Sequence, residues 1–405
     1  MRKEYLVIIA FLALVVGLLG ALYFNEASSS IESEAASESE VINEPDPIAE
    51  EVSPTVIEAS PEPFYSEILT ENGKRPSVPL GNGKGVLVTN DAIITLHGES
   101  GTVYASRHED VAGEAVVTSV VIDDGLGNTN PSALSGTGDS VLAMWMATDG
   151  PSVSLSDNGG RTWGETTLLA ERPVGSATPT SCTWIDSDNQ VRAIAAWTAP
   201  PISGDGGYLY AREFINGTWE EAVRVGTNEL ASSPSLACNS QGQMMALRDG
   251  DIGNLNVFLT IRGGDGSWPE PKKVFKGADP HMAWCGNRIW IGYHGIGAFR
   301  AYSDDGGDSW EKETLSKAGK FGAIACDEKT VAITWGDFED LAAANGKDES
   351  KRKVGAAVSF NDGETWEDWR PAGEEVNQSI ASLSILDETI AIFWRTLDRI
   401  RVTTY

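Results

Sequence analysis

The stretch SLSDNGGRTW (residues 154–163) follows an alternating apolar run, and its residue types recur in two later stretches. These are YSDDGGDSW (302–310) and VSFNDGETW (358–366), so the shared pattern is Ser-x-Asp/Asn-x-Gly-x-Thr/Ser-Trp. The positions that define it are Ser156, Asn158, Gly160, Trp163, Ser303, Asp305, Gly307, Trp310, Ser359, Asn361, Gly363 and Trp366. Asp, Asn and Ser side chains bond nearby backbone groups, and Gly permits the left-handed conformation. The placement after a strand therefore predicts three structural hairpin turns rather than catalytic loops.

A short apolar strand that usually ends near an aromatic residue also recurs, seven times in all. Equivalent positions lie 42 to 59 residues apart, and they are Leu96, Trp145, Trp197, Arg248, Tyr293, Trp335 and Trp394. One further strand precedes each of these strands, and others follow it. Four short strands per repeat of this length predict an all-β fold, a β-propeller of four-stranded blades. We expect seven blades, with six as the alternative.

The last repeat contains three strands, and the sequence then stops one strand short of a blade. The segment PFYSEILT (63–70), which precedes the first repeat, is predicted to supply the missing outer strand. Closure of this kind removes exposed sheet edges. It also favours a closed ring over an open solenoid, which is the architectural alternative.

The first 62 residues differ in character from the repeats. Residues 1–4 include two basic side chains, and residues 5–24 are uncharged and mostly apolar, enough to span a bilayer as a helix. The basic flank favours a cytoplasmic N-terminus. We therefore expect a single-pass signal anchor in the cell membrane, with a cleaved signal peptide as the alternative. Residues 25–62 are acidic and rich in Ser, Ala and Pro, which predicts a disordered linker to a propeller at 63–405.

The formal net charge is −29, and the excess of acidic residues continues through the repeats. No binding of nucleic acid is expected, because its phosphates are bound by clustered Lys and Arg. The sequence has no glycine-rich phosphate loop that opens a helix and no serine nucleophile elbow. Neither a metal nor a cofactor is expected. The acidic balance favours a partner outside the cytoplasm that is a neutral or cationic glycan, or the basic surface of a protein.

The three tryptophan-containing stretches resemble the Asp-box, or bacterial neuraminidase repeat, of the sialidase-like β-propeller superfamily. The resemblance covers residues 63–405, although Asn158 and Asn361 stand where the family usually has Asp. It implies turns on the face opposite the active site, and so no catalytic role for the motif itself. Sialidases of this superfamily use an arginine triad, a Tyr–Glu nucleophilic pair and an Asp acid/base. Their first arginine lies in an Arg-Ile-Pro sequence, whereas the nearest stretch here has Pro76 after Arg75.

Loops that enter the first strands and loops that leave the second strands should form one rim of the propeller. The candidate ligand-binding residues on or beside this rim are Arg248, His281, Tyr293, His294, Arg300, Asp337 and Arg395. A pocket formed by the three arginines and Tyr293 has the composition of a carboxylate-binding site. The structural interpretation, which we favour, pairs these arginines with neighbouring acids. His281 and His294 are expected to approach each other near Asp279, but their spacing matches no defined metal motif.

The leading functional hypothesis is therefore an anchored extracytoplasmic propeller that binds a glycan or a partner protein as a recognition or scaffold module. The alternative is an exo-acting glycoside hydrolase of the sialidase type. A third hypothesis, a structural envelope-assembly factor, makes the same sequence predictions as the first. Propellers host many functions, so the fold alone does not decide among the three.

Four cysteines occupy equivalent places in consecutive repeats, each near the end of a predicted first strand: Cys182, Cys238, Cys285 and Cys326. First strands line the channel of a propeller, so cysteines on adjacent blades are expected to lie close together. An even count in an oxidising compartment favours the disulfides Cys182–Cys238 and Cys285–Cys326. Four buried free thiols are the alternative.

Overall fold

The computed structural model describes residues 65–69, 85–112, 114–124, 130–171, 177–199, 207–226, 234–240, 242–249, 255–295, 297–317, 319–338, 352–369, 382–395 and 399–404. The predicted membrane segment (5–24) and acidic linker (25–62) lie outside these residues. Within the described ranges, no helix combines the length and apolar character that crossing a bilayer requires. The regular structure of these ranges consists of β-strands.

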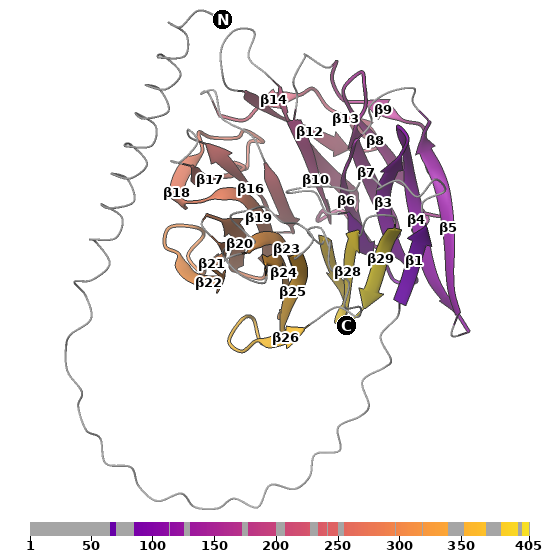
Figure 1. Ribbon diagram of the computed structural model, residues 1–405. Helices are drawn as coiled ribbons and strands as arrows, with labels where there is room; N and C mark the ends of the chain where they lie inside the picture. Colours follow the sequence, from indigo (N-terminus) through magenta and orange to yellow (C-terminus); the bar gives the residue numbers. More distant parts are fainter. Residues whose placement is uncertain are drawn as a thin grey trace, which may run out of the picture. The chain divides into compact units, whose positions relative to one another are not determined.

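The strands form seven separate antiparallel sheets, the blades of a propeller, so the predicted fold and blade number are confirmed (Figure 1). Each of the first six blades uses consecutive strands, ordered from the innermost to the outermost. Blade 1 contains β2 (Val86–Val88), β3 (Ile93–Glu99), β4 (Thr102–Val111) and β5 (Glu114–Asp123). Blade 2 contains β6 (Asn130–Thr137), β7 (Ser140–Met146), β8 (Pro151–Ser156) and β9 (Thr167–Leu168). Blade 3 contains β10 (Ala177–Ile185), β11 (Val191–Ala199), β12 (Tyr208–Ile215), β13 (Thr218–Trp219) and β14 (Val223–Arg224).

The next three blades repeat this order. Blade 4 contains β15 (Ser235–Asn239), β16 (Gly242–Asp249), β17 (Asn256–Ile261) and β18 (Lys272–Lys276). Blade 5 contains β19 (Ala278–Cys285), β20 (Arg288–His294), β21 (Ala298–Ser303) and β22 (Glu311–Ser316). Blade 6 contains β23 (Lys320–Asp327), β24 (Thr330–Phe338), β25 (Arg352–Ser359) and β26 (Glu367–Trp369).

Blade 7 joins the two ends of the repeat region. It contains β27 (Ser382–Leu386), β28 (Thr389–Arg395), β29 (Arg399–Thr404) and, as its outer strand, β1 (Tyr65–Leu69). β1 pairs antiparallel with β29, from Tyr65 opposite Thr403 to Leu69 opposite Arg399. The prediction that PFYSEILT supplies the missing strand and closes the ring is therefore confirmed.

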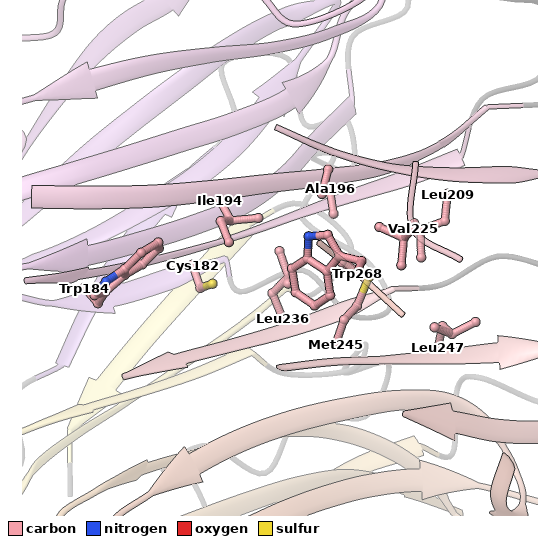
Figure 2. Close-up of a cluster of buried hydrophobic side chains, with 11 residues drawn as sticks. Cys182, Trp184, Ile194, Ala196, Leu209, Val225, Leu236, Met245, Leu247 and Trp268 are labelled. Atoms are coloured by element: carbon pink, nitrogen blue, oxygen red, sulfur yellow. The ribbon is translucent and has the colours of Figure 1, made fainter. Parts of the chain in front are cut away.

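The core lies between the blades, because each sheet buries both faces against its neighbours. Figure 2 shows one such layer between blades 3 and 4. Ile194 and Leu209 of blade 3 meet Leu236, Met245 and Trp268 of blade 4 there, and all five are buried. This two-sided burial explains why the second strands read as nearly continuous apolar runs.

Blade 1 also buries two histidines near the closing strand. The ring nitrogens of His108 share 2.9 Å hydrogen bonds with the hydroxyls of Ser66 on β1 and Thr95 on β3. The ring of His97 stacks on Tyr104 at a centroid separation of 5.3 Å, and its Nδ1 has no hydrogen-bond partner among the described residues. Burial lowers the pKa of His97 to about 4, and burial with the nearby His97 lowers the pKa of His108 to about 3.

Acidification is therefore expected to destabilise the protein between pH 6.5, the usual pKa of histidine, and about pH 4. In this window the unfolded chain binds a proton at His97 that the folded chain excludes, so stability present above pH 6.5 is lost as the pH falls. The loss is on the order of 3 kcal/mol for this residue. Melting temperatures at pH 7, 5.5 and 4.5 would measure it. The variant His97→Phe keeps a ring beside Tyr104 and should show a smaller fall, so equal falls would contradict the assignment.

The three tryptophan-containing stretches, residues 156–163, 303–310 and 359–366, form turns with one hydrogen-bond pattern, and we call them the Trp turns. In the first, the backbone N–H of Gly160 donates to the Ser156 hydroxyl at 2.8 Å, and the N–H of Thr162 donates to Asn158 Oδ1 at 2.9 Å. The second and third turns repeat both bonds at the same distances. Asn thus fills the acceptor role of Asp305, because both side chains present an oxygen at that position.

The glycine that all three Trp turns share has a positive φ and also contacts the preceding blade. The φ values are +80° at Gly160, +96° at Gly307 and +84° at Gly363. A Cβ on Gly160 would lie 2.9 Å from Cδ1 of Ile94, and one on Gly307 would lie 2.6 Å from Cδ2 of Leu259. A Cβ on Gly363 would overlap the ring of Trp290, which is fully buried. Glycine is therefore required both by the turn and by the contact between blades.

Two arginines fasten Trp turns to the preceding blade. Arg107 of β4 donates to the carbonyl of Gly159 in blade 2 and pairs with Asp91 at 2.8 Å. Arg288 of β20 donates to the carbonyl of Asp362 in blade 6. Both turns are thus bonded to a neighbouring sheet as well as to their own.

The four cysteines lie on the first strands of blades 3 to 6 and are joined in adjacent pairs. The Cα atoms of Cys182 and Cys238 are 5.8 Å apart, and those of Cys285 and Cys326 are 6.0 Å apart. Both separations are normal for disulfides. The bonds link blade 3 to blade 4 and blade 5 to blade 6.

Non-reducing peptide mapping is expected to recover the peptide pairs Cys182/Cys238 and Cys285/Cys326. Reduction should lower stability by about 2–4 kcal/mol per bond, because each bond restricts a long loop of the unfolded chain. Alkylation of the four cysteines in the unreduced, unfolded protein would contradict the pairing, as would a Cys238/Cys285 peptide.

Candidate functional site

The predicted rim lies at the ends of the second strands, where many connections fall outside the described residues. Arg248, Asp337 and Arg395 lie at or near the ends of β16, β24 and β28, but the structure does not describe their side chains. The predicted involvement of these three residues in ligand binding therefore stays a prediction.

Tyr293 is packed inside the fold rather than exposed on the rim. Its ring lies against Phe275 and Phe299, with centroids 4.6 and 5.4 Å away, and only 6% of the residue is accessible. Burial raises the pKa of its phenol. No carboxylate of the described residues accepts a hydrogen bond from this phenol, so the Tyr–Glu pair of a sialidase has no counterpart at this tyrosine.

The two predicted rim histidines have different surroundings. His294 Nε2 lies 3.3 Å from an oxygen of Asp279, so the expected proximity of Asp279 is found, whereas His281 lies opposite Gly292 on β20 and not opposite His294. His281 is buried, and its ring packs on Phe321 of blade 6 at 5.5 Å. No three His, Cys, Asp or Glu side chains of the described ranges are close enough together to hold a metal ion.

Arg300 corrects the predicted pocket of arginines and Tyr293. It lies opposite Gly292 on β20, whereas Tyr293 lies opposite Phe299. Neighbouring positions of a strand point to opposite faces, so Arg300 faces blade 6 and Tyr293 faces blade 4. The two side chains therefore cannot line one pocket.

Arg300 instead forms the floor of a cleft between blades 5 and 6. The cleft has a volume of about 410 Å³, and its lining includes Arg300, Glu313, Ser316, Trp335, Trp366 and Asp368. β21 and β22 of blade 5 form one wall, while β24, β25 and the third Trp turn of blade 6 form the other. We call it the blade 5–6 cleft.

Strand pairing and stacking fix the guanidinium of Arg300 in this cleft. Glu313 lies directly opposite on β22 and accepts from Arg300 Nε at 2.9 Å and also from Nη2. The guanidinium carbon lies 3.8 Å from the ring centroid of Trp366. Trp366 is itself held by a 2.9 Å bond from its Nε1 to the carbonyl of Gly363. The two groups that orient Arg300 are therefore held themselves, Glu313 by its place on β22 and Trp366 by its bond within the third Trp turn.

The charges in the cleft are placed asymmetrically. The Arg300 side chain is 9% accessible, whereas that of Glu313 is 61% accessible. Burial lowers the pKa of Arg300, and the carboxylate of Glu313 offsets part of that change. Asp368 adds a second carboxylate at the exposed edge. The cleft thus offers solvent-facing acceptors above a buried, neutralised cation.

A second cavity of about 200 Å³ lies at the channel end of the first strands, and its lining includes Leu134, Trp284, Ile385 and all four cysteines. A third, of about 300 Å³, lies between blades 7 and 1 and includes Asp91, His108 and Asp387. Neither contains a fixed cation facing solvent-exposed acceptors, so neither matches the recognition chemistry of the blade 5–6 cleft.

Sequence reasoning missed Glu313, Trp335 and Asp368 as site residues and treated Trp366 only as part of a turn. One signal was present: Arg300 and Glu313 occupy facing positions in a predicted hairpin. The residues that blade 6 adds to the cleft had no such signal in the sequence, because no short-range pattern relates Arg300 to Trp366, which lies 66 residues later.

No family model matches this chain, and no curated protein matches it in sequence. Three solved structures illustrate its similarity to known folds. The structure described as YCF48 bound to a D1 peptide is 12% identical, with a TM-score of 0.48, over 84% of this chain and 97% of that one. The polysaccharide lyase Uly1 is 9% identical, with a TM-score of 0.48, over 80% and 89%. The six-bladed fucose-recognising lectin of Aleuria aurantia is 12% identical, with a TM-score of 0.45, over 75% and 98%.

Likenesses this distant carry no argument about activity. The assignment of the fold therefore rests on the seven sheets of this chain and on their pairing.

Proposed function

We propose that this protein is a recognition module that binds a glycan in the blade 5–6 cleft, outside the cytoplasm. The observation that carries the proposal is the constellation at Arg300. A buried guanidinium is fixed by Glu313 and Trp366 at the base of an open cleft of about 410 Å³. Desolvating such a group costs free energy, which the ion pair and the stacking contact offset, and both contacts orient the guanidinium within the cleft.

The chemistry of the lining fits sugar hydroxyls. An exposed carboxylate is a strong acceptor for sugar hydroxyl groups. The side chain of Glu313 remains 61% accessible although it pairs with Arg300, so its carboxylate can still accept from a sugar. Ser316 adds a hydroxyl group on the same strand. Two carboxylates against one arginine leave the cleft negative, which disfavours sialic acid and favours a neutral or amino sugar.

The remainder of the proposal concerns placement in the cell. Residues 5–24 act as a signal anchor and residues 25–62 as the linker that carries the propeller. The Trp turns belong to the Asp-box type of the sialidase-like superfamily, and they serve as structural turns. A sialidase-type hydrolase is not favoured, because Tyr293, the candidate nucleophile, is buried against Phe275 and Phe299.

The variant Glu313→Gln is expected to weaken binding of neutral or amino glycans by about tenfold or more, the worth of one charge-assisted hydrogen bond. Glutamine still accepts from Arg300, so the fold should be unchanged. A panel of neutral, amino and sialylated oligosaccharides, titrated by calorimetry after an array screen, would measure it.

The matched control is Glu311→Gln, which makes the same change two residues earlier on β22, at a side chain outside the cleft lining. It should bind like the parent. Failure of the parent to bind any neutral or amino sugar would contradict the proposal, and so would equal loss in both variants.

A further inference from the structure

The outer strand of blade 1 differs from every other outer strand of the described propeller. β5 has ten residues, and the eight from Ala115 to Ile122 carry no charge. Four of those eight are valine. The outer strands of blades 4, 5 and 6 contain Lys or Glu, and β9 and β13 are two residues long.

The free edge of β5 is accessible. β5 ends its sheet, with β4 as its only strand partner in the described ranges, and Figure 1 shows it on the outside of the blade. Val116 is 40% exposed and Val121 is 49% exposed. In the described part of the chain, one bond reaches the outer backbone edge, from the Thr166 hydroxyl to the Ile122 carbonyl at 3.3 Å.

Such an edge normally requires protection. Exposed edge strands are templates for pairing with another strand, and proteins usually protect them with charges, proline, bulges or short length. β5 is long, uncharged along its middle and rich in β-branched residues, which are the features that favour pairing. Its register irregularity with β4 lies at Ile122, near the end of the strand, and leaves the stretch from Glu114 to Val121 regularly paired.

We propose that β5 is a dimerisation edge, on which β5 of a second copy of this chain pairs antiparallel. The sequence of the strand favours a second copy over another protein. EAVVTSVVID has nearly the same residue classes in both directions, so antiparallel pairing about a twofold axis at Thr118 or Ser119 sets mostly apolar and hydroxyl side chains against one another. Because the middle of the strand carries no charge, this pairing sets no two like charges directly opposite each other, although each copy has a net charge of −29.

The geometry determines the assembly. The twofold axis passes near Thr118 and Ser119, at the middle of the strand. Each copy has one such edge in the described propeller, so pairing closes at two copies and does not propagate into a fibre. One strand pair buries an area of roughly 1,000 Å², the lower end of specific interfaces, so the dimer should be weak and concentration-dependent.

The test uses the full chain in a mild detergent, with mass measured by light scattering from about 1 to 100 µM and corrected for bound detergent. The parent should shift from one copy to two across this range. Val121→Lys should remain monomeric throughout. The control Val223→Lys makes the same change on the outer strand of blade 3, at a side chain of 45% exposure, and should dimerise like the parent.

Crosslinking provides a second readout that does not depend on Val121→Lys folding normally. A bifunctional maleimide of about 10 Å reach should couple the variant Thr118→Cys to its own copy, since these positions meet near the axis. Glu114→Cys should not couple, because antiparallel pairing separates the two copies of that position by about 26 Å or more. A parent that stays monomeric would overturn the proposal. A dimer that persists in folded Val121→Lys would also overturn it, as would equal coupling of both cysteine variants.

Discussion

A chain that begins at Lys74 should melt well below one that begins at Pro61, because the shorter chain lacks β1. The longer chain keeps the five register pairs between Tyr65–Leu69 and β29. It also keeps the bond from Ser66 to His108 and the ion pair of Glu67 with Arg401 at 3.3 Å. Loss of these bonds, offset by the freed entropy of the strand, should cost about 3–5 kcal/mol. That corresponds to a fall in melting temperature of more than about 5 °C.

The control for this comparison is the full chain, which should melt like the chain that begins at Pro61. Scanning calorimetry would compare all three. Equal melting of the two shortened chains would mean that the pairing of β1 with β29 adds nothing to stability, and the closure argument would then fail.

Replacing Gly363 by Ala should destabilise the protein by about 2–5 kcal/mol, the sum of a left-handed backbone penalty and overpacking. The backbone penalty arises because φ is +84°. The overpacking arises because the new methyl group overlaps the ring of Trp290, which is fully buried and cannot move outward. Guanidinium denaturation monitored by tryptophan fluorescence would measure the change.

Gly306→Ala separates the two contributions. Gly306 lies in the second Trp turn with a φ of +74°, and a Cβ there meets nothing within 4 Å. This variant should carry the backbone penalty alone, about 1–2 kcal/mol. If Gly363→Ala costs no more than Gly306→Ala, the contact with Trp290 does not constrain the turn.

The architecture was largely predictable because each blade is a local unit. The aromatic-ended strands and the Trp turns are short-range patterns, and the missing strand of the last repeat pointed to β1. Pairing of the cysteines followed from their equal positions on adjacent inner strands. These inferences need only the alternation of a strand and the order of blades.

The candidate site was less predictable because it lies between blades. The direction in which Arg300 points depends on the register that places it opposite Gly292, so the expected grouping of Arg300 with Tyr293 was wrong. The residues that complete the cleft, such as Trp335 and Asp368, come from a different sheet. Contacts of this kind depend on how two sheets pack, which no periodicity within either sheet encodes.

The pairing of Tyr65 with Thr403 has a kinetic consequence. The outer hairpins of the other blades close over short turns, whereas this pair brings together residues 338 positions apart. Its loop-closure entropy delays it until most of the ring exists, so the edge of β29 is among the last to be covered during folding. Until then β1 of another nascent chain competes for the same edge. Refolding at high protein concentration should therefore favour molecules that have exchanged their first strands, a domain swap that dilution before refolding suppresses.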